Sequence, residues 1–182
     1  NTSFAGALLR EANLEGTNLT GVDLQGADLQ DANLQGANLD SANLSFANLW
    51  GANLHQAHLN ETNLKRADLR WSILNKADLE KSDLKEADLT SAQLRKTNLR
   101  GAILKWADLN GAFLIEADLT GADMFRSNLV RTQMTGTILN AANLSLTNMM
   151  EANLTNADLT GTTLHDAVVS NKNWLTLLAE WQ

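Results

Sequence analysis

The 182-residue sequence contains no cysteine and no proline. Without cysteine the chain has no disulfide, no thiolate metal ligand and no cysteine nucleophile, and the redox compartment stays open. Proline is the one residue that lacks a backbone N–H. Its absence therefore suits a chain in which nearly every backbone N–H is needed for pairing.

Long apolar runs and a signal peptide are also missing. No stretch approaches the roughly 18 apolar residues of a membrane span, so we expect no membrane association. The chain begins at Asn1 without methionine, which predicts a processed form or a fragment of a longer protein. We expect a cytoplasmic protein, or a protein of the periplasm or a lumen if Asn1 follows a removed segment.

Basic residues are the minority, with 14 Lys and Arg against 21 Asp and Glu and a net charge of −7. Such a chain is repelled on average by nucleic acid, so we expect no direct nucleic acid binding. The charge is unevenly distributed along the chain. Residues 65–105 contain ten basic and six acidic residues, whereas residues 1–64 and 106–182 are net acidic, at −6 and −5.

What the sequence does contain is a five-residue repeat, as in ADLQDANLQGANLDSANL at residues 27–44. From Phe4 to Val169 every fifth residue is apolar, and we call these 34 positions the centres. The residue two before each centre is Ala, Ser, Thr or Val, and the residue just before it is Asp or Asn in 23 repeats. Repeats this regular determine the whole fold.

A period of five fits neither a helix nor a strand. On a helix the centres would spiral around the axis, and on a strand they would alternate between faces. Each repeat must therefore turn, with the centre and the small residue inward and the residue between them outward. The predicted core includes Leu14, Leu34, Leu54, Leu74 and Leu94.

Glycines support a corner in every repeat. All eleven fall two residues after a centre, where a type II turn needs positive φ. No glycine lies between Gly51 and Gly101, which predicts another turn type for the corners in that stretch. Repeated turning coils the chain into a solenoid with coils about 4.8 Å apart.

The pattern A-(D/N)-L-x-x, as in residues 27–29 and 37–39, resembles the pentapeptide-repeat family over residues 2–169. The resemblance implies an all-β fold, a right-handed quadrilateral β-helix with four five-residue repeats in each coil. The 34 repeats would then form about eight and a half coils. We assign residues 1–170 to this β-helix.

After Val169 the pattern fails, and residues 171–182 predict a short C-terminal α-helix. Its apolar face consists of Trp174, Leu177, Leu178 and Trp181. A solenoid end needs a cover, so we interpret this helix as a cap. The alternative is a dimerisation or partner-binding helix, which leaves a monomer and an end-to-end dimer both open.

Signals for chemistry are sparse. His55 and His58 are three residues apart, but no third ligand accompanies them, so we predict no metal site. Serine and threonine hydroxyls have no placed base beside them. A convex rod with a filled core offers no obvious pocket, so we predict no catalytic residues, no cofactor and no enzyme activity.

Four repeats in each coil would stack Lys65, Lys85 and Lys105 in one row. The neighbouring row holds aromatic and charged residues together, and further tryptophans lie one corner along. We define the basic-aromatic corner as the candidate partner-binding surface, made of Phe46, Trp50, Lys65, Arg66, Trp71, Lys85, Lys105 and Trp106. Cations and aromatic rings together favour an acidic protein or an anionic ligand.

The alternative interpretation is a solvated row of ion pairs. Asp68, Asp88 and Asp108 each follow a lysine of the row by three residues and could neutralise it. In the neighbouring row, Arg66 could pair with Glu86 and lie over Phe46.

We therefore expect a scaffold that presents rows of side chains to a protein partner whose identity the sequence does not give. The resemblance implies a second possibility, because some members of the family mimic duplex DNA and bind a type II topoisomerase. Mimicry needs a dominantly acidic rod. The four repeats of a coil would form four faces, and the outward positions of these faces carry net charges of 0, −4, +1 and −4. We rank it second.

Overall fold

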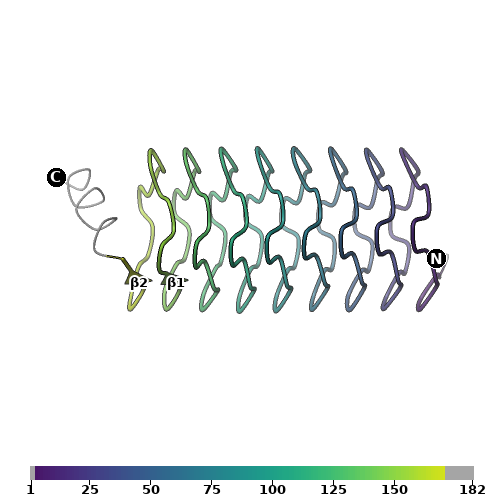
Figure 1. The fold of residues 1–182 in the computed structure, drawn as a ribbon, viewed down its shortest axis with the longest axis horizontal. Coiled ribbons are helices and arrows are strands. Elements are labelled where there is room, and N and C mark those ends of the chain that lie inside the picture. The colour runs from purple at the N-terminus through teal and green to yellow at the C-terminus, as the bar shows by residue number, and fades with distance from the viewer. Residues whose placement is uncertain (1–2, 171–182) are drawn as a thin grey trace.

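The computed structural model describes residues 3–170, and they form one solenoid of stacked coils (Figure 1). Each coil pairs in parallel with the next, from Ser3 with Asp23 to Asn143 with Thr163. At the last coils the pairing extends over two residues, where β1 (Asn148–Met149) pairs with β2 (Val168–Val169). Four five-residue repeats therefore make one coil. The helix predicted for residues 171–182 lies outside the described residues.

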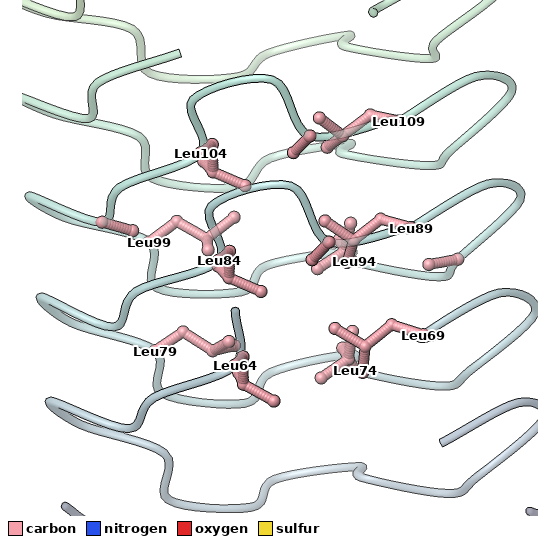
Figure 2. Packing of buried hydrophobic residues seen from close by; sticks show 14 of the residues in the cluster. Leu64, Leu69, Leu74, Leu79, Leu84, Leu89, Leu94, Leu99, Leu104 and Leu109 are labelled. Atoms are coloured by element: carbon pink, nitrogen blue, oxygen red, sulfur yellow. The ribbon is translucent and has the colours of Figure 1, made fainter. Parts of the chain in front are cut away.

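Leucines fill the interior of the solenoid in columns. Figure 2 shows Leu64, Leu84 and Leu104 one above another, each from a successive coil. Of the predicted core residues, Leu34, Leu54, Leu74 and Leu94 are at most 1% exposed, whereas Leu14 is only partly buried. The difference arises because Leu14 belongs to the first coil, which has a neighbouring coil on one side only.

Every backbone N–H of a regular repeat has an acceptor. In residues 84–88, three N–H groups donate to carbonyls of adjacent coils at 2.8–3.0 Å, and the N–H of Ala87 closes the turn onto the Leu84 carbonyl at 3.0 Å. The remaining N–H, that of Lys85, donates to the Asp83 carboxylate at 3.2 Å. An Asp or Asn just before a centre thus caps the corner that follows it. Five occupied donors per repeat explain why proline is excluded.

The corners share one geometry whether or not they contain glycine. The residue two after the centre has positive φ at every corner, with +66° at Gly51 and +59° at Lys76. The nine corners without glycine between Gly51 and Gly101 have φ between 55° and 61°, so the prediction of another turn type there is wrong. Pairing with both neighbouring coils imposes the corner, although a non-glycine residue in this region costs about 1 kcal/mol or more.

Candidate partner-binding groove

A shallow groove of about 550 Å³ runs across the basic-aromatic corner. It lies over successive coils, because the residues that form it recur at equivalent positions of paired coils. Five of the eight predicted residues line it, and they are joined by five that the sequence reasoning did not single out for this surface. The lining consists of Ser45, Phe46, Asn63, Lys65, Arg66, Asp83, Lys85, Glu86, Ile103 and Lys105.

The three predicted tryptophans are placed differently. The Trp106 ring lies beside the groove, 4.9 Å from the Lys85 ammonium and edge-on to Phe125 at 5.9 Å. Trp50 and Trp71 do not line the groove, although they are 37% and 60% exposed.

Two of the three stacked lysines pair with aspartates, but with other aspartates than those predicted. Lys65 Nζ lies 3.0 Å from Asp83, and Lys105 Nζ lies 2.9 Å from Asp123. The predicted pairing with an aspartate three residues later is wrong, and Asp68 is held by Arg70 at 2.5 Å instead. The predicted partner lies around the corner from its lysine, whereas the observed partner lies on the same face in the next coil.

The same pairing between coils recurs elsewhere on the rod. Arg10 pairs with Asp28 at 3.4 Å, and Arg100 pairs with Asp118 at 2.9 Å. A cation just after a centre therefore lies beside the residue that precedes the equivalent centre of the next coil. This pairing could have been found from the sequence, because it follows from four repeats per coil.

Lys85 departs from this pattern because Ile103 stands just before the centre of the next coil. Its ammonium lies 3.7 Å from Glu86 and 4.9 Å from the Trp106 ring. Glu86 is at the same time bound by Arg66 at 2.6 Å. Lys85 therefore shares one carboxylate with a second cation, while its neighbours in the row each have an aspartate of their own.

The predicted contacts of Arg66 are confirmed. Its Nε donates to the Glu86 carboxylate, and its guanidinium lies 5.8 Å from the centre of the Phe46 ring. The hydrogen bond from Arg66 lowers the pKa of Glu86, as does the nearby charge of Lys85. The two side chains are exposed, so this pair adds little to stability.

The Asp68–Arg70 pair predicts part of the response to acid. The hydrogen bond from Arg70 lowers the pKa of Asp68 below its usual range, against the opposing effect of partial burial. A lowered folded-state pKa stabilises the protein above the unfolded pKa, near pH 4, and this stability is lost as the pH falls through the folded value. We expect the urea midpoint of Asp68→Asn to lie below that of the wild type at pH 6 and to approach it at pH 2. Parallel midpoint curves would contradict the assignment.

Residues 3–170 lack two other kinds of site. That part of the chain holds no group of three or more His, Cys, Asp or Glu side chains that could bind a metal ion. It also contains no helix of the length and apolar character needed to cross a bilayer.

Comparison with known proteins found a matching family profile and similar solved structures. A family profile described as pentapeptide repeats (8 copies) matches residues 1–36, 37–75, 62–101, 102–140 and 127–166. The solved structure of HetL, a pentapeptide-repeat protein involved in heterocyst differentiation regulation from the cyanobacterium Nostoc sp. strain PCC 7120, is 36% identical. That match covers 92% of this chain and 83% of HetL, with a TM-score of 0.49.

A more distant similarity is to full-length QnrB1, a plasmid-mediated fluoroquinolone resistance protein. The two chains are 19% identical, with 96% of this chain and 97% of QnrB1 covered and a TM-score of 0.49. A search of curated proteins found no match.

Proposed function

Because the chain belongs to the pentapeptide-repeat family, whose coil is right-handed, we propose that it is a non-enzymatic interaction module. Its groove at residues 45–105 binds an acidic segment of a partner protein. The observation that carries this proposal is a cation-lined groove in a chain of net charge −7. A solenoid with a filled leucine core has its side-chain rows as its recognition surface.

The charge balance of the groove supports an anionic partner. Its four cations, Lys65, Arg66, Lys85 and Lys105, have three carboxylates within 4 Å, which leaves one positive charge in excess. The excess falls between Arg66 and Lys85, which share Glu86. Apolar area lies beside it, because Phe46 is 53% exposed and Trp106 is 43% exposed. Aromatic residues and arginine are enriched at protein interfaces, and Trp and Arg are frequent binding hot spots.

We favour this function over DNA mimicry because of how charge is arranged on the faces of the rod. A mimic of duplex DNA must present acidic side chains continuously along the rod. Here the lysine row occupies successive coils on one face, and the two most acidic faces are separated by faces of net charge 0 and +1. The similarity to QnrB1 is of fold and adds no weight to a topoisomerase partner.

Charge reversal at Lys85 tests the proposal. Proteins captured from native extract by the wild type and by Lys85→Glu would be compared by quantitative mass spectrometry. Each differential partner would then be purified and titrated against both. We expect Lys85→Glu to weaken binding by about tenfold or more, because a repulsive carboxylate replaces the least neutralised cation. Binding of the wild type should also weaken steeply as salt is raised.

Lys76→Glu is the matched control, because Lys76 occupies an exposed corner outside the groove and has no ion pair within residues 3–170. It changes the net charge by the same amount. A partner that Lys85→Glu retains at low salt with unchanged affinity would refute the groove as the binding surface. Equal losses in both variants would show that only net charge matters.

A further inference from the structure

Each of the two aspartates beside the lysine row both caps a corner of the backbone and forms an ion pair with a lysine. Asp83 Oδ1 accepts a hydrogen bond from the Lys85 backbone N–H at 3.2 Å, and Asp83 Oδ2 forms the ion pair with Lys65 Nζ at 3.0 Å. One carboxylate thus joins a backbone donor of its own coil to an ammonium of the preceding coil.

Asp123 repeats this arrangement two coils further along. Its Oδ1 accepts from the Phe125 backbone N–H at 3.3 Å, and its Oδ2 lies 2.9 Å from Lys105 Nζ. The same pair of donors therefore converges on a carboxylate on both sides of the intervening coil.

In the intervening coil the carboxylate is replaced by Ile103, which is 36% exposed. The two donors that would converge on it are still present. The Lys105 backbone N–H has no acceptor within residues 3–170, because isoleucine cannot cap the corner. Within residues 3–170 the only carboxylate near the Lys85 ammonium is the shared Glu86, at 3.7 Å, and the Trp106 ring lies 4.9 Å away.

We infer that these two donors form a subsite for a carboxylate of the bound partner. A glutamate or aspartate side chain of an acidic, extended peptide segment accepts from the Lys105 N–H and pairs with Lys85 Nζ. Over Ile103 the partner's carboxylate would thus make the same two interactions, one with a backbone N–H and one with a lysine ammonium, that Asp83 and Asp123 make within the chain. An apolar side chain next to it in the segment covers Ile103 and Phe46, which line the same groove. This inference rests on the proposed function and specifies its ligand.

A singly charged carboxylate fits this position better than a phosphate does. Asp83 and Asp123 lie one coil away on either side, at about 4.8 Å per coil. Two flanking negative charges repel a dianion more strongly than a monoanion. The partner is therefore an acidic protein segment and not a phosphorylated one.

A second place on the rod has the same replacement and supplies a control. Phe113 stands to Arg95 as Ile103 stands to Lys85, so an apolar residue again occupies the position where aspartate is usual. Arg95, however, lies 3.2 Å from Glu116. Phe113 is also on another face and lines a separate, smaller groove of about 310 Å³.

The experiment supplies the missing carboxylate from within the chain. Ile103→Asp is expected to fold, because the chain already stacks Asp68, Asp88 and Asp108 in one row. The probe is the peptide acetyl-Glu-Leu-Glu-Leu-Glu-amide, with its Gln-for-Glu counterpart as the neutral reference. Binding is followed by NMR through the Lys105 amide and the Trp106 indole signals.

We expect the acidic peptide, and not the neutral one, to shift both signals in the wild type. Ile103→Asp should weaken its affinity by about tenfold or more, because the new carboxylate takes both donors. Phe113→Asp should leave the affinity within about twofold of the wild type, because it adds the same charge on another face. The affinity of Ile103→Asn should lie between those of the two aspartate variants, because an asparagine oxygen can accept from the backbone N–H of the corner. Asn63 Oδ1 does so from the equivalent Lys65 N–H at 3.2 Å.

The outcomes separate this inference from the proposed function. If Ile103→Asp binds the peptide as tightly as the wild type does while Lys85→Glu loses it, the groove binds acidic segments but the subsite is refuted. Absence of any shift at the Lys105 amide in the wild type also refutes the subsite. If Ile103→Asp does not fold, unchanged affinity of Ile103→Asn refutes it. Equal binding by all variants, Lys85→Glu included, refutes the proposed function itself.

Discussion

Replacing Leu74 by aspartate is expected to lower the free energy of unfolding by at least about 4 kcal/mol. Leu74 is fully buried within its column (Figure 2). Truncating a buried leucine alone costs about 2–5 kcal/mol. The new carboxylate would in addition face the leucine side chains of the neighbouring coils, which have no hydrogen-bond donor to offer it. Urea unfolding at neutral pH, followed by circular dichroism, measures the loss.

Lys76→Asp is the control, because it places the same side chain two residues further along the chain. Lys76 lies on an exposed corner with φ of +59°, a region that aspartate tolerates better than most residues. Its replacement should change the free energy of unfolding by about 0.5 kcal/mol or less. Equal tolerance of the two substitutions would mean that the inward and outward assignments are wrong.

The inward side of the solenoid was predictable because one position of each repeat is always apolar and another always small. The apolar residue at each centre, such as Leu74, is by itself enough to mark that position as inward. The corners were predicted less well. Glycine marks a left-handed corner when present, but Trp71 and Lys76 adopt the same φ because pairing with adjacent coils imposes it. A sequence contains no direct signal for that constraint.

The groove was predictable in its main residues, since stacking of four-repeat coils brings Lys65, Lys85 and Lys105 together. The ion pairs of Lys65 and Lys105 were not predicted, because the nearest aspartate in sequence lies around a corner. What matters for Lys85 is the residue just before the centre of the next coil, and Ile103 attracts no attention until Asp83 and Asp123 are seen to bind its neighbours. The candidate subsite is therefore a departure from a repeat, and it becomes visible only when the repeat's own interactions are known.

The five-residue register predicts opposite outcomes for two deletions, one of a whole coil and one of a single residue. Deletion of residues 126–145 removes one whole coil and joins positions that are equivalent in successive coils. Every later centre up to Val169 keeps its position in the repeat. Stability of a solenoid is approximately a sum over coils and their interfaces. We therefore expect a shorter folded rod with a modestly lower free energy of unfolding and a smaller urea m-value.

Deletion of Gln133 alone should be far more damaging. Each later residue then moves back by one position, so the centres after residue 133 are filled by residues such as Thr135, Asn140 and Thr160. The small inward positions receive residues such as Asp158. Polar groups without partners would line the interior of every following coil, and these coils should fail to form. Limited proteolysis should then cleave the chain beyond residue 133 while the preceding coils resist, whereas the variant lacking a whole coil resists throughout. Equal protease resistance of the two variants would mean that the five-residue register does not determine the fold.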